Sequence, residues 1–569
     1  MNGGNGGRAG GGRPAFGGVG GSGPDGQDGA DGGTFQESGG GGGGGGAGSG
    51  PNDGGAGGRG GLGGAGGAGG TAVSPNGEAG SDGNGTGGAA GGGGGYSGFS
   101  GATLDNLATL VGGNGGNGGS LSTPGPGIRG GGAGGGGEGG YGAIVTGSPG
   151  LPDRNGGTIV AGDGGAGGTA FQGFGGNGGA GGIGVLFAGT SGGIFENTGT
   201  VAGGDGGTRG GSDSPFLVGA DGTGGPGIVG ANLTIVNSGS ITGGLAGDGV
   251  TRADAITFGA GLNLLAIRDG STMTGLVSGG GTETLDYSGY TASGVNVDLA
   301  AGTATGTGGV ADIETVFGSD QADTIAGDAN ANTIEGGGGA DVLLGGEGND
   351  TLSGGRGFDR FDGGAGADAF DGGVALDIVD YISAGAGIEV DLTSGGTAGD
   401  ALGDTFTSIE IVLGSFFDDT LNGDDVSNGL VGNNGADVLN GRAGNDQLIG
   451  GDGDDTLQGG LGSDSLNGGN GADAFVFSDI ADSVAGARDR IVGFEQGTDV
   501  VDLSAIDADA TTAGDDAFTY IGGAAFSGTA GELRAFGLRV LGDTDGDGVA
   551  DFEFSTDVPV VFTSDDFVL

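Results

Sequence analysis

Fourteen oxygen-bearing side chains recur at a spacing of nine residues in the C-terminal half of the chain. The register from Gly318 is GSDQADTIA, GDANANTIE, GGGGADVLL, GGEGNDTLS, GGRGFDRFD, GGAGADAFD and GGVALDIVD, and it restarts at Gly414 as GSFFDDTLN, GDDVSNGLV, GNNGADVLN, GRAGNDQLI, GGDGDDTLQ, GGLGSDSLN and GGNGADAFV. With the positions of each nonapeptide numbered one to nine, position eight is always apolar. Position six carries Asp323, Asn332, Asp341, Asp350, Asp359, Asp368, Asp377, Asp419, Asn428, Asp437, Asp446, Asp455, Asp464 and Asp473. Carboxylate and amide oxygens beside glycines, whose carbonyls can approach an ion closely, are the ligands that calcium prefers.

The nine-residue period predicts how these side chains are positioned. Six residues form a turn and three form a short strand with its middle side chain inward, so two nonapeptides close one coil of eighteen residues. Alternate nonapeptides then lie on opposite edges, and position six forms columns. The expected columns are Asp323, Asp341, Asp359 and Asp377 opposite Asn332, Asp350 and Asp368, and Asp419, Asp437, Asp455 and Asp473 opposite Asn428, Asp446 and Asp464.

Carboxylates stacked about 4.8 Å apart repel one another unless a cation lies between them. Calcium suits such a column better than magnesium, which holds its waters, and we expect about four or five ions per block. The neutral Asn332 and Asn428 should weaken the first turn on one edge of each block. Ordering nine residues costs roughly 9–18 kcal/mol of backbone entropy, whereas burying one Leu or Ile returns about 1.5–3 kcal/mol. Calcium binding and folding are therefore predicted to be one event.

A second acidic group lies near the C-terminus, in Asp543-TDGDGVADFEF. Asp543, Asp545 and Asp547, followed by Gly548, match the first half of a D-x-D-x-D-G calcium loop. The twelfth position is occupied by Phe rather than by the usual bidentate Glu, which stands one place early. The sequence predicts a single-loop calcium site with Asp551 as a further ligand; the alternative is a polar turn between strands.

Composition excludes most catalytic classes. The 569 residues include 171 Gly, with 15 basic against 71 acidic residues and a formal net charge of -56. There is no His, Cys or Trp, and every basic residue is Arg. Zinc-protease helices, Ser-His-Asp triads, P-loop lysines and disulfides are thereby excluded. The charge argues against nucleic acid and anionic membranes as partners, and no apolar run is long enough for a transmembrane helix.

The chain divides by composition into seven regions. The nonapeptide blocks are 318–380 and 414–476; each follows a strand-rich lead-in, 285–317 and 381–413, and the two lead-ins are similar in sequence. Residues 477–569 are expected to cap the second block. Residues 141–284 carry related stretches beginning at Asn155, Asn197 and Asn237, which predict β-helix-like repeats, with loose hairpins as the alternative. Residues 1–140 are so rich in Gly that we expect a flexible low-complexity arm; the alternative is stacked polyglycine-type helices.

The nonapeptides resemble the G-G-x-G-x-D-x-U-x repeat of RTX (repeats-in-toxin) proteins. This resemblance implies an all-β fold in which both blocks form parallel β-rolls around calcium ions. Ala474-FVFSD and Asp489-RIVGFEQGTDVVDLSAID are similar to the region that caps such rolls. The chain end, Asp565-DFVL, resembles the uncleaved signals of type I secretion substrates, with a frayed terminal strand as the alternative. Residues Met1 to Gly20 lack the pattern of a cleavable signal peptide.

These patterns predict a secreted, extracellular or cell-surface protein that folds on binding calcium and has a structural or adhesive role without catalysis. Its expected partners are calcium ions, the type I secretion machinery, and a cell-surface polysaccharide or another surface protein. The alternative is a polysaccharide-acting enzyme that carries RTX repeats and works through paired carboxylates, or through calcium and Arg on a β-helix. A pore-forming toxin is disfavoured because the chain has neither a long apolar helical region nor any Lys to acylate.

Overall fold

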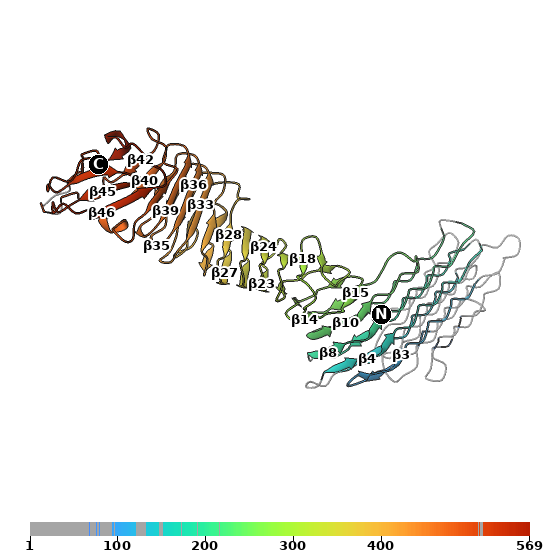
Figure 1. Ribbon diagram of the computed structural model, residues 1–569. Helices are drawn as coiled ribbons and strands as arrows, with labels where there is room; N and C mark the ends of the chain where they lie inside the picture. The colour runs from blue at the N-terminus through green and yellow to red at the C-terminus, as the bar shows by residue number, and fades with distance from the viewer. Residues whose placement is uncertain are drawn as a thin grey trace. The chain divides into compact units, whose positions relative to one another are not determined.

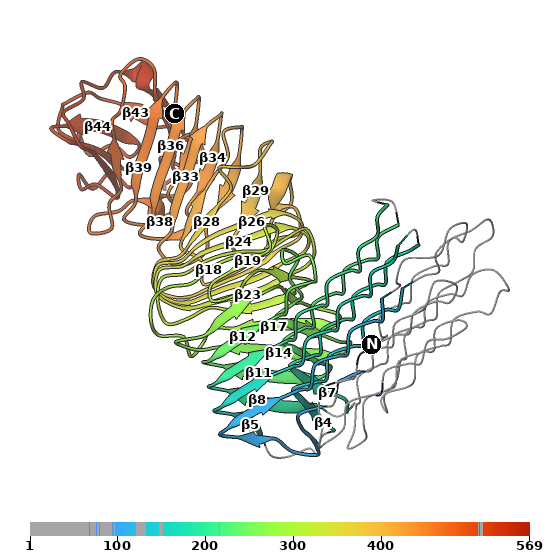
Figure 2. The ribbon, with the colours of Figure 1, turned by 90° about the vertical axis from the view of Figure 1, so that its right-hand side faces the viewer.

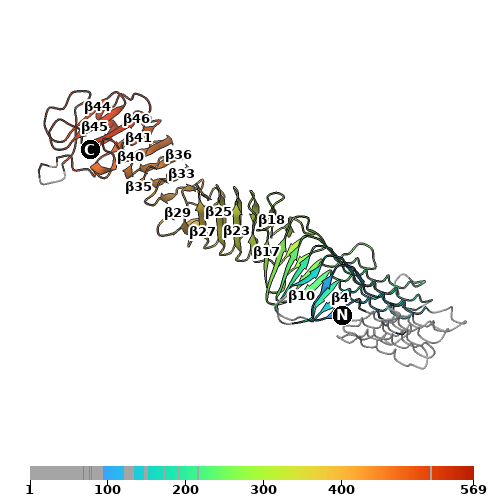
Figure 3. The same ribbon diagram turned by 60° about the horizontal axis from the view of Figure 1, so that its bottom comes forward.

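In the computed structural model, most of the named strands pair in parallel (Figures 1 and 3). The structure describes residues 97–120, 133–146, 152–171, 173–189, 192–214, 217–509, 511–512 and 516–569, together with 68, 76, 79, 94 and 95. Within these ranges there are three single 3-10 turns and no α-helix, and no helix is long and apolar enough to cross a membrane. The chain forms two compact units, one of residues 1–292 and 301–315 and one of residues 293–300 and 316–569. The strand β21 (Thr315–Phe317) lies at the change from one unit to the other along the chain.

The first unit is a parallel β-helix with three faces. Each of the first five coils contributes one short strand to each face, later strands extend only the first and second faces, and the named strands of each face pair in parallel. The first face is built from β1 (Ser100–Gly101), β4 (Ala143–Val145), β7 (Val185–Phe187), β10 (Ile228–Gly230), β13 (Ile256–Phe258), β16 (Val277–Ser278) and β20 (Val310–Ala311). The second contains β2 (Asp105–Asn106), β5 (Asp153–Asn155), β8 (Gly193–Asn197), β11 (Leu233–Asn237), β14 (Leu262–Ile267) and β17 (Thr282–Asp286). The third contains β3 (Thr109–Val111), β6 (Thr158–Val160), β9 (Thr200–Ala202), β12 (Ser240–Thr242) and β15 (Thr272–Thr274). The predicted β-helix is confirmed, and the hairpin alternative is wrong.

The repeated asparagines of this unit form a buried ladder at the end of the second face. Asn106 donates from Nδ2 to Oδ1 of Asn155 at 2.8 Å, Asn155 to Asn197 at 2.8 Å, and Asn197 to Asn237 at 2.7 Å. Asn237 completes the ladder by donating to Oγ of Ser271 at 2.6 Å. The repeat that the sequence shows every 40 residues or so therefore marks one coil, with its amide as the internal polar support.

Between the third face of one coil and the first face of the next, the chain leaves the β-helix along glycine-rich segments (Figure 2). Hydrogen bonds recur at every third residue: the N–H groups of Gly112, Gly115 and Gly118 donate to the carbonyls of Val160, Asp163 and Ala166 at 2.7–2.9 Å. A period of three is that of the polyproline II conformation, which glycine adopts as polyglycine helices. For the described residues of 112–120 and 133–140, the expectation of a flexible arm is thus wrong and the stacked polyglycine alternative holds. The rest of the predicted arm lies outside the described residues.

These segments are ordered by backbone hydrogen bonds between neighbouring polyglycine helices, and the composition alone does not reveal such bonds. A Cβ on Gly165 would stand 2.0 Å from the carbonyl oxygen of Gly116. Only glycine permits this approach, and every third residue (Asp163, Ala166 and Thr169 in one segment) faces outward instead. The triplets of the sequence therefore match the period of the polyglycine helix.

The second unit contains the nonapeptide blocks as a parallel β-roll with two faces. One face is a single sheet, continued at its far end by antiparallel strands. Its strands, in spatial order, are β18 (Asn296–Asp298), β22 (Thr324–Ala326), β24 (Val342–Glu347), β26 (Arg360–Ala365), β28 (Ile378–Asp380), β31 (Ile411–Leu413), β33 (Gly429–Asn434), β36 (Gln447–Asp452), β39 (Ser465–Asn470), β41 (Arg490–Val492), β46 (Phe552–Thr556), β45 (Arg539–Asp543), β44 (Glu532–Phe536) and β43 (Thr519–Tyr520). Because β28 pairs with β31, this sheet passes from the first block to the second without a break.

The opposite face of the roll is in two pieces. The first piece contains β23 (Thr333–Gly338), β25 (Thr351–Arg356) and β27 (Ala369–Val374) of the first block, followed by β30 (Thr405–Thr407) of the second lead-in. The second piece begins in that lead-in with β29 (Glu389–Asp391), continues through the second block with β32 (Thr420–Asn422), β34 (Val438–Asn440), β37 (Thr456–Gln458) and β40 (Ala474–Val476), and ends in the C-terminal region with β42 (Val500–Asp502) and β47 (Phe567–Val568). A separate two-stranded parallel sheet is formed by β35 (Ala443–Gly444) and β38 (Leu461–Gly462), which follow β34 and β37 in the sequence. Thr324 pairs with Val342, eighteen residues on, which confirms that two nonapeptides close one coil.

The narrow core of the roll is built from position eight. All fourteen of its side chains are buried, from Ile325 to Phe475. Phe370 packs between Phe361 and Phe406, with ring centroids 5.9 and 5.7 Å away. The roll thus buries one large side chain per nonapeptide, as the apolar position eight predicts.

The C-terminal residues close the roll with a cluster of aromatic rings. Phe477 packs on Phe552 and Phe554, with ring centroids 5.1 and 5.3 Å away. In the two stretches whose sequences resemble such a cap, Phe475, Phe477, Ile491, Phe494 and Leu503 are buried. Val500 is only half-buried, because the inward position of its strand belongs to Val501.

Candidate metal centres

The position-six side chains form the predicted columns, and each column is held by hydrogen bonds between successive coils. The N–H of Asp323 donates to Oδ1 of Asp341 at 2.8 Å, that of Asp341 to Asp359 at 2.9 Å, and that of Asp359 to Asp377 at 2.8 Å. The same bond at 2.7–3.0 Å links Asn332–Asp350–Asp368, Asp419–Asp437–Asp455–Asp473 and Asn428–Asp446–Asp464. The sequence therefore predicted correctly which of these residues stand above one another.

The carboxylates of the columns are buried with one oxygen unused. All fourteen position-six side chains are at most 4% exposed. From the third to the seventh nonapeptide of each block, Oδ2 has no hydrogen-bond partner: Asp341, Asp350, Asp359, Asp368, Asp377, Asp437, Asp446, Asp455, Asp464 and Asp473. An unpaired buried carboxylate oxygen is costly, and a row of them beside glycine-rich turns fits a hard, oxygen-seeking divalent cation.

Burial and mutual repulsion raise the pKa of these acids. Desolvation, with the neighbouring Asp359 and Asp323 as smaller causes, raises the pKa of Asp341 to about 7. The same causes, with different neighbours, raise the pKa of Asp437 and of Asp446 to about 7. Hydrogen bonds from the backbone oppose these shifts without cancelling them. The metal-free column therefore favours protons, and a cation that neutralised the carboxylates would remove the same penalty.

Glycine at positions one and two makes room for this arrangement. A Cβ on Gly336, at position one, would lie 2.4 Å from Oδ2 of Asp341. Gly337, at position two, has φ +101°, and a Cβ there would lie 2.5 Å from the carbonyl oxygen of Ser319 in the preceding coil. A side chain would fill the space beside the unused oxygen or strain the turn.

Four acids at the ends of the columns were missed by the nonapeptide register. Asp368, Asp377, Asp464 and Asp473 donate their N–H groups onward to Asp404 (2.7 Å), Glu410 (3.0 Å), Asp489 (2.9 Å) and Asp499 (3.1 Å), respectively. Desolvation raises the pKa of Asp489, whose Oδ2 is also without a partner, to about 8. A signal was present, because each acid stands two residues before an apolar strand residue, as in the nonapeptides; it was overlooked because the preceding turns differ in length.

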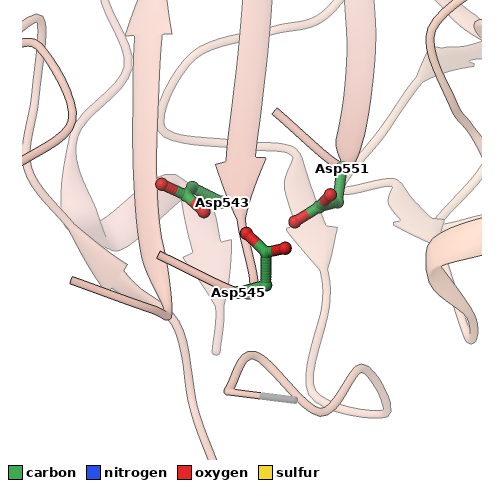
Figure 4. Close-up of side chains that lie close together, drawn as sticks. All are labelled: Asp543, Asp545 and Asp551. Carbon is green, nitrogen blue, oxygen red and sulfur yellow. The ribbon is translucent and has the colours of Figure 1, made fainter. Parts of the chain in front are cut away.

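The C-terminal loop brings three of its four predicted ligands together (Figure 4). One carboxylate oxygen each from Asp543, Asp545 and Asp551 lies within 4.8 Å of the others. Asp543 is fully buried and accepts N–H groups from Gly546 at 2.8 Å and Gly548 at 2.9 Å. Asp547 is exposed and outside this group.

The glutamate displaced by one place in this loop, Glu553, has a different role. Its Oε1 lies 2.9 Å from Arg488 and its Oε2 lies 3.4 Å from Arg539. As the sequence pattern suggested, no bidentate Glu faces the three aspartates of this loop.

Comparison with known proteins agrees with this geometry. Residues 308–343 and 344–379 match the family described as RTX calcium-binding nonapeptide repeat (4 copies), and residues 422–554 match Peptidase M10 serralysin C terminal. No curated protein matches the chain. Among solved structures, the solution structure of the AlgE6R3 subunit from the Azotobacter vinelandii mannuronan C5-epimerase is 30% identical, over 27% of this chain and 78% of that one, with a TM-score of 0.14. The chain carries RTX calcium-binding repeats and a serralysin-type C-terminal region.

Proposed function

Starting from the RTX repeats that this chain carries, we propose that it is a secreted structural protein whose β-roll folds around calcium ions outside the cell. The observation that carries this proposal is the row of buried Oδ2 atoms without hydrogen-bond partners along both edges of the roll. A buried carboxylate whose charge is not compensated destabilises the fold by several kcal/mol. A calcium ion shared by neighbouring coils would supply the missing partner.

The residues that would hold calcium are the position-six aspartates from the third nonapeptide onward, together with carbonyls of the glycine turns. Bound calcium would supply positive charge and oxygen coordination. The chain contributes the rest: inter-coil N–H···Oδ1 bonds fix each carboxylate, and position eight anchors each turn to the core. Folding would thus bring ligands from successive coils into register as calcium binds.

A non-catalytic role is part of the proposal. The acids of the roll take part in inter-coil bonding rather than converging on a cleft, and the composition lacks His, Lys and Cys. Stacked coils with repeating outer faces suit adhesion or the assembly of an extracellular layer. A cell-surface polysaccharide or another surface protein is the proposed partner.

Secretion is supported by the region that follows the roll. Residues 422–554 match the serralysin C-terminal family, which is typical of RTX proteins exported by type I secretion. Low cytosolic calcium would keep the roll unfolded for export, and the higher extracellular concentration would fold it.

The test is a calcium titration of the full chain, followed by far-UV circular dichroism and by equilibrium dialysis. We expect β-content to rise in the sub-millimolar to millimolar range typical of extracellular calcium modules, and magnesium at equal concentration to leave it unchanged. Full β-content in excess chelator, or no bound calcium, would refute the proposal. Turnover in a screen of polysaccharide hydrolases and lyases would refute its non-catalytic part.

The Asp543 loop is proposed to hold one further ion. Asp543→Asn with Asp551→Asn should lower the number of bound calcium ions by one at saturation, because two of the three converging carboxylates lose their charge. Asp547→Asn is the matched control, since this side chain lies outside the group. An unchanged ion number in the double variant would exclude the site.

A further inference from the structure

The twelve position-six aspartates fall into two groups by the hydrogen-bond partner of Oδ2. In the third to seventh nonapeptides of each block, Oδ2 has none. In the first nonapeptide of each block, Oδ2 is satisfied by the chain: Asp323 accepts the N–H of Ser319 at 2.6 Å, and Asp419 accepts the N–H of Ser415 at 2.6 Å. The same turn motif thus occurs with two different patterns of hydrogen bonding.

The serines of the first nonapeptides also satisfy the other oxygen. The hydroxyl of Ser319 donates to Oδ1 of Asp323 at 3.0 Å, and that of Ser415 to Oδ1 of Asp419 at 2.7 Å. The same Oδ1 atoms accept N–H groups from the lead-ins, from Val295 at 2.6 Å and from Ile388 at 2.8 Å. Three donors on one carboxylate stabilise its charge without an ion.

In the second nonapeptide of each block, position six carries an uncharged side chain whose Oδ1 is paired within the chain, although Nδ2 of Asn428 has no partner. Oδ1 of Asn332 accepts the N–H of Asp328, and Oδ1 of Asn428 accepts the N–H of Asp424, both at 2.8 Å. An amide brings no negative charge, and half of it is a hydrogen-bond donor that repels a cation. The asparagines that interrupt the acidic pattern therefore lie where charge is not needed.

The backbone of these turns differs as well. Position two of the later nonapeptides takes positive φ, even where it is not glycine: Asn433 has φ 78° and Arg442 has φ 69°. At position two of the first two nonapeptides, Ser319, Asp328, Ser415 and Asp424 do not take positive φ. In these turns, the N–H of position two donates a hydrogen bond to the position-six side chain. The first coil of each block therefore has its own turn geometry.

We infer that the first coil of each block, residues 318–335 and 414–431, binds no calcium and is closed by the chain's own hydrogen bonds. Calcium sites begin at the third nonapeptide, so each block has a metal-independent coil on which the calcium-dependent coils stack. This inference rests on the proposed function, since it specifies which rungs of the columns take ions. It also removes Asp323 and Asp419 from the set of required ligands.

The test counts calcium ions bound to the full chain at saturation, by equilibrium dialysis. The double variant Asp323→Asn/Asp419→Asn should bind the wild-type number of ions. The matched control, Asp341→Asn/Asp437→Asn, lies one coil further along the same columns and should lose at least two. A loss of two or more ions in the first pair would overturn the inference, whereas a wild-type chain that binds no calcium would refute the proposed function instead.

A second pair of variants decides the matter if the aspartate pair does not reach wild-type β-content in saturating calcium. Ser319→Ala/Ser415→Ala keeps both carboxylates and removes the two hydroxyls, which also accept the N–H groups of Gln321 and Phe417 at 3.1 Å. We expect an unchanged number of ions and a calcium midpoint about two- to tenfold higher, since about one hydrogen bond to a charged group is lost per block. An altered number of ions would show that calcium competes with the serines for these carboxylates, and would overturn the inference.

Discussion

The hydroxyl of Tyr381 donates a hydrogen bond to Oδ2 of Asp404 at 2.6 Å, inside the lead-in between the two blocks. Asp404 is the last rung above Asp368, whose N–H binds its Oδ1 at 2.7 Å. Both oxygens of this terminal carboxylate are therefore paired within the chain. Burial and the neighbouring Asp404 raise the pKa of Tyr381 well above its usual value, so the hydroxyl stays a donor at every physiological pH.

Tyr381→Phe removes this donor and leaves Oδ2 of Asp404 buried without a partner. We expect a loss of about 1–3 kcal/mol in the free energy of unfolding, which is the cost of an unsatisfied buried group. Urea unfolding at fixed calcium measures it. Tyr290→Phe, at a half-buried tyrosine, is the control and should change the free energy by less than about 0.5 kcal/mol; equal effects of the two substitutions would contradict the role given to Tyr381.

The pH dependence of folding should reverse with calcium. The folded-state pKa of Asp341 and of Asp437 is raised to about 7, mainly by desolvation, so the folded metal-free chain binds more protons than the unfolded one. The protonated state then stabilises the fold fully below the unfolded pKa of about 4, and this stabilisation is lost as pH rises through about 7. Metal-free protein prepared on a chelating resin should have more β-content at pH 5 than at pH 8.

With calcium present, the pH dependence of folding has the opposite sign, because calcium ions must displace protons from the same carboxylates. The calcium midpoint should rise as pH falls from 8 to 5. Circular dichroism at both pH values, with and without calcium, measures the two trends. Greater β-content of the metal-free chain at pH 8 would show that the carboxylates are not desolvated as the structure has them.

Gly337→Ala and Gly338→Ala form a matched pair within one turn. At position 337, φ is +101° and a Cβ would stand 2.5 Å from Ser319 O; at position 338, the nearest atom would be 3.5 Å away and φ is not positive. We expect Gly337→Ala to lower the free energy of unfolding by at least about 2 kcal/mol through strain and crowding, and Gly338→Ala to change it by under about 0.5 kcal/mol. Urea titrations in saturating calcium compare them, and similar losses would count against the turn geometry.

The columns could be predicted from the sequence because a fixed period of nine converts directly into position on a coil. Asp323 and Asp341 must coincide once two nonapeptides make one turn of the roll. The continuity of the sheet through β28 and β31 could not be predicted this way. The turn at Ser408, where φ is 51°, is shorter than a nonapeptide turn, so the register is lost in the sequence although it is kept in space.

The glycine-rich segments escaped prediction for a different reason. Composition measures what glycine loses in entropy on ordering, but not what its bare backbone gains by close approach to another backbone. The informative signal was the position of the non-glycine residues. Asn114, Asn117 and Ser120 stand three apart, and the oxygens of their side chains accept the N–H groups of Asp163, Ala166 and Thr169 in the next segment.

Asn197→Ala should destabilise the β-helix independently of calcium. Asn197 accepts from Asn155 and donates to Asn237, and the substitution removes both bonds from the middle of a buried ladder. We expect a cost of about 1–3 kcal/mol, equal in calcium and in chelator, because the ladder lies in the first unit and the calcium columns lie in the second. Amide hydrogen exchange near Asn155 and Asn237 measures it. Thr198→Ala, at the exposed neighbouring residue, is the control. A calcium-dependent loss of stability in Asn197→Ala would contradict the independence of the asparagine ladder from the calcium columns.

The order of the polyglycine segments depends on glycine at the positions where two backbones meet. Gly165 donates its N–H to Gly137 O at 2.8 Å and accepts from Gly179 N–H at 2.8 Å, while its Cα faces Gly116 O. Gly165→Ala should push these segments apart, at a cost of about 1–3 kcal/mol as for other overpacked sites. Ala166→Ser, one residue on at an outward position, should cost less than about 0.5 kcal/mol. Hydrogen exchange of the amides at Gly165 and Gly179 should accelerate in the first variant alone, because a helix bundle closed by every third N–H cannot accept a methyl group between its chains. Slow exchange retained in Gly165→Ala would mean that the segments do not pack backbone against backbone.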